Sequence, residues 1–205
     1  MDFTGVVHGR RMTRAFSARS VEPQLLNRLV DLASRAPSAG KTQGWHLLII
    51  EGEQVAEFWN ATFPLESRSE FKWQQLFDAP VIAIAFADPD AYVRRYGETD
   101  KTSTGLGTGV SAWPTPYWTV DASFAVMTLL LAAQDVGLGA LFFAVFNGAD
   151  EVRRIFGVPE QLQLIGAIAL GWPLDQSTES AVPELGVSAS RQRRSSSEII
   201  HRQRW

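Results

Sequence analysis

The sequence of 205 residues contains no cysteine. This absence excludes disulfides, thiolate metal sites and a cysteine nucleophile. Histidine is scarce as well, because only His8, His46 and His201 are present and their spacing matches no common metal site. The motifs GxSxG and GxGxxG and the Walker loop are also missing. We therefore expect no catalytic metal, and the reactive group of any redox chemistry would have to be a cofactor.

Long hydrophobic runs and an excess of basic charge are missing too. The longest apolar stretch, residues 122–133, is interrupted by Ser123 and Thr128 and is too short to cross a bilayer. The net charge of −3 argues against nucleic acid or an anionic membrane as a partner. The N-terminus lacks the apolar core and cleavage site of a signal peptide, so we expect a cytoplasmic protein.

Hydrophobic residues form the majority of several short segments, and their spacing predicts alternating helices and strands. With 45% apolar residues and no linker or repeat, the chain predicts a single domain over residues 1–205. Helices covering both faces of a sheet are expected, in a mixed α/β or α+β arrangement. The expected helices cover residues 23–36, 119–136 and 150–156, and the expected strands cover residues 45–50, 79–88, 139–146 and 164–172.

Two loops do not fit this regular pattern. Residues 96–116 are rich in Gly, Thr and Ser, and loops of this length in a compact domain are usually functional or disordered. The segment Pro37–Gln43 offers backbone donors, a hydroxyl, an amide and an ammonium group within seven residues. It is either an ordinary helix stop and turn, or a polar edge that faces a flat ligand.

Arginines gather at both ends of the chain. Their forked guanidinium groups suit phosphate oxygens, because each can bind two at once. They are either solvated, frayed termini or, if the two ends meet in space, one phosphate site. The arginines are Arg10, Arg11 and Arg14 at the N-terminus, and Arg191, Arg193 and Arg194 near the C-terminus.

These motifs, taken in order, resemble the FMN-dependent nitroreductase family over nearly the whole chain. The resemblance implies an α+β fold, a three-layer sandwich in which helices flank a central, mainly antiparallel sheet. It also implies an intertwined homodimer, with residues 191–205 as an extended C-terminal tail. The motifs that carry it are RRMTRAF at residues 10–16, APS at 36–38, QGW at 43–45, GLG at 137–139, the strand IGAIALGW and the tail RRSSSEIIHRQRW.

The resemblance assigns FMN-binding roles position by position and assigns no catalytic side chain. Arg10 is expected at the phosphate, and Arg14 at the pyrimidine edge of the ring or at the ribityl chain. Met12 stands where the family often has Ser, so it would act through its backbone. The other assigned residues are Arg11 in the N-terminal cluster; Pro37, Ser38, Ala39, Lys41 and Gln43 in the loop, facing the flavin bound mainly by the other subunit; Phe142 and Ala144 near N5; and Arg191, Arg193 and Arg194 at the phosphate.

The implied activity is a ping-pong reaction. NADH or NADPH would deliver a hydride to flavin N5, and an acceptor such as a nitroaromatic or a quinone would then be reduced. An oxidase or a dehalogenase on the same fold would share the FMN site, as would a flavin-binding, storage or regulatory protein without turnover.

Two positions depart from the family pattern. The family commonly has Asn where Lys41 stands and Pro where Gly44 stands. An ammonium group near the ring would favour the anionic reduced flavin and raise its potential, whereas a solvent-facing Lys41 would not.

Overall fold

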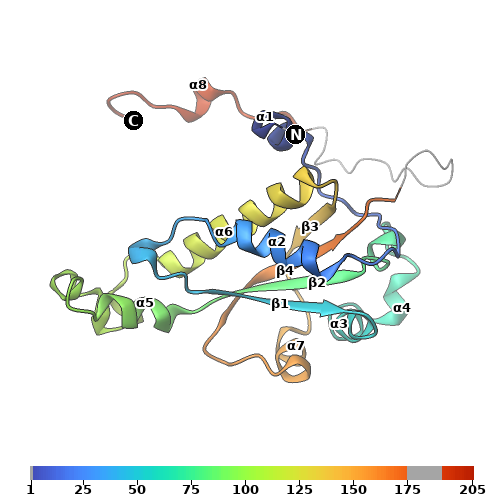
Figure 1. The fold of residues 1–205 in the computed structure, drawn as a ribbon, viewed down its shortest axis with the longest axis horizontal. Helices are drawn as coiled ribbons and strands as arrows, with labels where there is room; N and C mark the ends of the chain where they lie inside the picture. The colour runs from blue at the N-terminus through green and yellow to red at the C-terminus, as the bar shows by residue number, and fades with distance from the viewer. Residues whose placement is uncertain (1, 175–190) are drawn as a thin grey trace. The chain divides into compact units, whose positions relative to one another are not determined.

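A computed structural model gives the fold and describes residues 2–174 and 191–205 (Figure 1). Within the first range, four strands form one antiparallel sheet in the order β1-β2-β4-β3. The strands are β1 (Trp45–Glu51), β2 (Val81–Ala87), β3 (Gly139–Phe143) and β4 (Gln163–Gly171). This confirms the predicted α+β class with a mainly antiparallel sheet.

Helices connect and cover these strands. The described helices are α1 (Phe3–Gly9), α2 (Pro23–Ala33), α3 (Gln54–Thr62), α4 (Leu65–Arg68), α5 (Pro89–Tyr96), α6 (Tyr117–Asp135), α7 (Ala149–Phe156) and α8 (Ser196–Ile199). No helix in the described part of the chain combines the length and the apolar character needed to span a membrane.

The central strand β2 is buried on both faces, which explains its uninterrupted apolar sequence. Its alternate side chains enter two separate cores. Val81, Ala83 and Ala85 pack with residues of α2 and α6, whereas Ile82 and Ile84 pack with residues of α3. Figure 1 shows α2 and α6 on one face of the sheet and α3 and α7 on the other. The predicted three-layer arrangement is therefore present within residues 2–174.

The long helix α6 is apolar on two sides. One side packs in the core with residues of the sheet and includes Val126, Leu129 and Ala133. On the other side, Phe124 and Met127 keep 46% and 40% of their surface exposed. Helix α1 packs against α6 and exposes Phe3 and Val7. A helix that is hydrophobic all round is normally buried, so these four residues, which we call the α1/α6 apolar surface, are unusual for a chain on its own.

Several boundaries differ from the sequence predictions. Helices α1 and α5 were not predicted, because each is short and mixes polar with apolar residues. The predicted strand over 139–146 ends at Phe143, where its partner β4 stops pairing at Ala167. Next to that point the pairing of β2 with β4 shifts register, and Gly166 has a φ of 159°. This bulge bends β4 away, so residues 144–146 have no strand to pair with.

Residues 191–205 belong to a unit separate from Met1–Leu174. Helix α8 begins with a capping box, in which Ser195 and Glu198 satisfy each other's backbone N–H groups. Arg194 donates to the carbonyl oxygen of Glu198, and Arg191 and Arg193 are exposed. Both the extent of a single domain and a phosphate site shared by the head and tail arginines stay predictions.

Candidate functional site

The N-terminal arginine motif lies against the edge of the sheet. Met12 forms a parallel bridge with Ala140 of β3, and the Thr13 N–H donates to the Ala140 carbonyl oxygen at 3.0 Å. Phe16, four residues after Met12, is buried, and its N–H donates to the Gln75 carbonyl oxygen at 3.1 Å. These contacts fix the backbone of residues 12–16, which includes Arg14 and directly follows Arg10 and Arg11.

The three arginines of this motif have different surroundings. Arg11 donates to the carbonyl oxygens of His8 and Gly9, at 2.6 and 3.2 Å, and so caps the end of α1. Arg14 donates to the Met12 carbonyl oxygen at 3.1 Å and lies over the indole of Trp73, 4.8 Å from the ring centroid. Within the described residues, Arg10 reaches only the Met12 sulfur, at 3.2 Å. Since a thioether is a weak acceptor, Arg10 keeps the most donor capacity for an anion.

The loop Pro37–Gln43 has an unusual backbone. It contains a short 3-10 turn over Ala39–Lys41, and Gly40, Lys41 and Gln43 have φ values of 62°, 55° and 55°. The left-handed region costs a non-glycine residue about 1–2 kcal/mol. Such strain persists only where the surroundings enforce it, and it is concentrated at functional sites.

Side chains from two helices hold this loop. Asp121 of α6 is buried, and its Oδ2 accepts hydrogen bonds from the Ala39 N–H and the Tyr92 hydroxyl, both at 2.7 Å. On α5, Arg95 Nε donates to the Gly40 carbonyl oxygen at 2.9 Å. None of these three side chains was predicted from the sequence as part of the site. The available signal was an acidic residue, Asp121, inside a strongly apolar helix.

Position 44 is Gly in this chain, where the family commonly has Pro, and the structure gives a steric reason for a residue without a side chain. A Cβ at residue 44 would lie 2.7 Å from Cε2 of Tyr92, which is closer than real Cβ contacts come. The Tyr92 ring occupies that space and makes edge contacts with Trp113 and Trp118 at centroid distances of 5.7 and 6.3 Å. Glycine at position 44 and tyrosine at position 92 therefore fit as a pair.

Burial, together with the hydrogen bond to Asp121, raises the pKa of the Tyr92 hydroxyl far above its usual range. An unfolded Tyr92 would release its proton near pH ~10, while the folded form keeps it. The stability that Tyr92 contributes is therefore present below about pH 10 and is lost as the pH rises beyond it. When tyrosinate absorbance is followed against pH in folded protein, we expect the curve of Tyr92→Phe to match that of the wild type. A native wild-type signal near pH 10 that disappears in this variant would contradict the prediction.

The remaining predicted residues lie on different elements. Phe142 is half-buried in β3 and packs against the core on the α2/α6 side. Ala144 is exposed just beyond the end of that strand. Lys41 is exposed; its N–H donates to the Ser38 carbonyl oxygen at 2.9 Å, and its ammonium group has no hydrogen bond or ion pair within the described residues. The structure thus brings Met12 beside the strand of Phe142, while the loop Pro37–Gln43 is held by α5 and α6.

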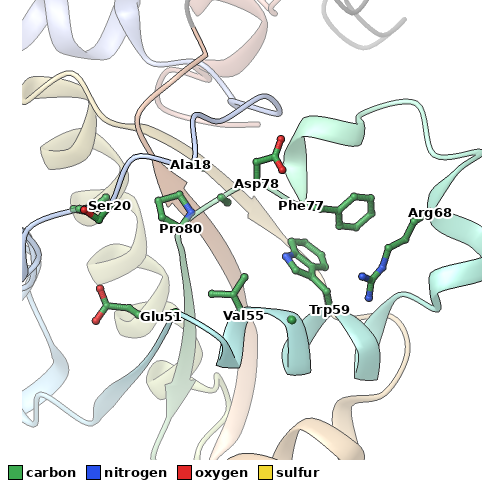
Figure 2. A pocket seen from close by; sticks show the side chains of 13 residues that line it. Ala18, Ser20, Glu51, Val55, Trp59, Arg68, Phe77, Asp78 and Pro80 are labelled. Atoms are coloured by element: carbon green, nitrogen blue, oxygen red, sulfur yellow. The ribbon is translucent and has the colours of Figure 1, made fainter.

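A pocket of about 470 Å³ opens elsewhere, beside α3 (Figure 2). Figure 2 shows the Trp59 ring between Val55 and Phe77, and the indole nitrogen is buried without a hydrogen-bond partner in the described residues. The guanidinium of Arg68 is already bonded to the Phe63 carbonyl oxygen and to Asn60, at 3.0 and 2.8 Å. None of the predicted flavin-binding residues lines this pocket, so it is separate from the candidate site.

The geometry thus defines an α+β protein with an arginine available for an anion and a strained polar loop held by buried groups. The sequence profile of the Nitroreductase family matches residues 7–172. The chain belongs to the nitroreductase family.

Individual relatives agree with this assignment. A protein of Archaeoglobus fulgidus, provisionally named NADH dehydrogenase/NAD(P)H nitroreductase, is 23% identical over 98% of this chain and 97% of its own length. A 4-nitrobenzoate reductase of Nocardioides sp. is 26% identical over 83% of this chain and 80% of its own length. Among solved structures, a provisionally assigned nitroreductase of Exiguobacterium sibiricum in complex with FMN superposes with a TM-score of 0.67 at 19% identity, covering 95% of this chain and 98% of that one. The last similarity concerns the fold.

Proposed function

We propose that this protein is an FMN-dependent oxidoreductase that takes reducing equivalents from NADH or NADPH. Family membership and the names of the relatives support the class, an NAD(P)H-dependent oxidoreductase of the nitroreductase type. The FMN complex of a protein with the same fold supports the cofactor. The single observation in this structure that carries the proposal is Arg10, whose guanidinium contacts only the weak sulfur acceptor of Met12 within the described residues and which stands two positions before the Met12 bridge to β3.

The residues present fit FMN. A phosphate needs charge-assisted donors, and Arg10 retains them, whereas Arg11 and Arg14 already donate to backbone carbonyls. We propose that Arg191, Arg193 and Arg194 supply further donors for the phosphate. Arg14, stacked on Trp73, is proposed at the ring or the ribityl chain. Pro37, Ser38 and Ala39, with Lys41 and Gln43, are proposed to border the flavin of the other subunit in a homodimer.

The chain's own groups act in this reaction by binding and positioning. When bound, FMN would supply hydride-transfer chemistry at its N5 atom, with NAD(P)H as donor and a nitroaromatic or a quinone as acceptor in a ping-pong sequence. The arginines orient the cofactor, and the loop Pro37–Gln43 borders its ring. The backbone near Phe142 and Ala144 is proposed to face N5. No side chain is required to exchange a proton with the substrate in this scheme.

The visible spectrum tests the proposal. Protein incubated with FMN and then desalted is expected to keep the absorption bands of bound oxidised flavin. Anaerobic addition of NADH or NADPH should bleach these bands, and a nitroaromatic or a quinone should restore them. Bands that neither donor bleaches would contradict the proposed oxidoreductase, and protein that keeps no flavin would contradict the cofactor.

Lys41→Asn is expected to change two properties. Asn tolerates the left-handed backbone at this position better than Lys, so the free energy of unfolding should rise by about 0.5–1 kcal/mol. An ammonium group near the ring also favours the anionic reduced flavin, so its removal should lower the flavin potential. Thermal melting of the flavin-free protein checks the first effect. Redox titration of the loaded protein checks the second, and an unchanged potential would place Lys41 away from the ring.

A further inference from the structure

The Tyr92 hydroxyl of α5 and a backbone N–H of the loop both donate to one buried carboxylate on α6. Asp121 is 6% exposed, and Tyr92 is 1% exposed. The same carboxylate oxygen, Oδ2, accepts from the Tyr92 hydroxyl and from the Ala39 N–H. A buried carboxylate must keep its hydrogen-bond donors or lose stability. The positions of α5, α6 and the loop are therefore coupled through a single oxygen atom.

The adjacent residue of the loop is held from a second direction. The Gly40 carbonyl oxygen accepts from Arg95 Nε at 2.9 Å. The orientation of Arg95 is itself fixed, because its two terminal nitrogens pair with the carboxylate oxygens of Asp100 at 2.7 and 2.8 Å. Two consecutive residues, Ala39 and Gly40, are thus restrained through an N–H and a carbonyl by two different helices.

These restraints act where the backbone is least favourable. Lys41 and Gln43 occupy the left-handed region directly after the restrained residues. A Cβ at Gly40 would lie 2.9 Å from Cε2 of Tyr96, so the ring also limits where the turn can sit. Without the bonds to Asp121 and Arg95, the loop would be free to relax toward ordinary backbone conformations. The polar groups of residues 41 and 43 would then move.

We propose that Asp121, with Tyr92 and Arg95, positions the strained loop Pro37–Gln43 so that it can border the flavin ring. Asp121 is a positioning residue, since it acts through the Ala39 amide. This inference rests on the proposed function, because it assumes that the loop meets FMN. It predicts that the loop is already shaped in the flavin-free protein, so that little conformational freedom is lost when FMN binds.

The test compares Asp121→Ala, Asp121→Asn and Tyr92→Phe with the wild type. Hydrogen exchange of peptides covering residues 37–43 in flavin-free protein reads the loop directly, and titration with FMN gives the dissociation constant. For Asp121→Ala, we expect loop exchange and the FMN dissociation constant each to rise about tenfold or more, since a buried hydrogen bond to a charged acceptor is lost. Asp121→Asn keeps an oxygen acceptor and should remain within about threefold of the wild type.

Tyr92→Phe keeps the ring that packs against Gly44 and removes only the hydroxyl. It should raise the loop exchange and the FMN dissociation constant by about threefold each. This variant remains informative if Asp121→Ala does not fold. Arg153→Ala is the matched control, because Arg153 restrains a different loop through the carbonyl oxygens of Pro159 and Leu162, at 3.0 and 2.6 Å. We expect faster exchange near residues 157–162 in this variant and an unchanged FMN dissociation constant.

The outcomes separate this inference from the proposed function. Wild-type protein that binds no FMN contradicts the proposed function, while exchange in residues 37–43 still reports whether Asp121 holds the loop. Wild-type protein that binds FMN, together with an Asp121→Ala variant that matches it in affinity, overturns the inference alone. An Asp121→Asn variant as defective as Asp121→Ala would also overturn it, because the charge and not the hydrogen bonds would then be responsible.

Discussion

Arg10→Ala is expected to bind FMN about 10- to 100-fold more weakly than the wild type, since a hydrogen bond to a charged group contributes about 1.5–3 kcal/mol. The reason is the position of Arg10, whose guanidinium meets only the Met12 sulfur within the described residues. Removing it leaves the fold largely intact and removes a phosphate donor. Titration of flavin-free protein with FMN, with quenching of the flavin fluorescence as the signal, measures the change in dissociation constant.

Arg19→Ala is the matched control for charge and location. Arg19 lies in the same N-terminal segment, but its guanidinium stacks on Trp172, 4.2 Å from the ring centroid. We expect its FMN dissociation constant to stay within about twofold of the wild type, because surface substitutions of this kind usually have small effects. Equal losses in Arg10→Ala and Arg19→Ala would indicate a general effect of net charge and would contradict a specific phosphate contact.

A related prediction concerns Arg193, near the C-terminus, and its effect on FMN affinity. If Arg193 binds the phosphate that Arg10 binds, the double variant should lose less affinity than the two single losses multiplied together, because groups that share a partner are not additive. A coupling of about 0.5 kcal/mol or more in this double-mutant cycle is expected. Strict additivity would show that the two arginines act on separate sites.

Phe124→Glu is expected to convert the proposed dimer to a monomer. Phe124 belongs to the α1/α6 apolar surface and is 46% exposed in a single chain. A second copy of the chain would bury this surface, and a carboxylate placed there without a partner would then be strongly unfavourable. Analytical ultracentrifugation should find the mass of two chains for the wild type and of one chain for the variant. FMN retention should fall with it, because the loop of the other subunit is lost.

Leu65→Glu provides the comparison for the dimer prediction. Leu65 is an apolar residue of α4 with 67% of its surface exposed, and it lies outside the α1/α6 apolar surface. The same chemical change at this position should leave the mass of the particle unchanged. A dimer that survives Phe124→Glu would show that the two chains meet through another surface.

The apolar strands were predictable because their signal is local. Val81–Ala87 is an unbroken apolar run, and burial on both faces is the reason for it. Such runs and the helical spacing between them indicated a mixed α/β or α+β arrangement, and the family resemblance implied the α+β class. The short helices α1 and α5 were not predictable in this way, because few of their side chains enter a core and their spacing carries little signal.

The support of the candidate site depends on contacts that sequence spacing does not reveal. Asp121 and Ala39 are 82 positions apart, yet they share a hydrogen bond. The left-handed conformations of Lys41 and Gln43 were equally invisible, since neither residue type favours them. The motif residues themselves could be named from the resemblance, because their order along the chain is enough. The contacts that hold these residues in place could be identified only from the three-dimensional structure.

The central claim is that arginines of this chain bind FMN within a particle of two chains. Size-exclusion chromatography with light scattering and flavin absorbance, after incubation with excess FMN, tests it in one run. We predict a coloured peak with the mass of two chains and one flavin for each chain. A colourless peak with the mass of one chain would contradict the account.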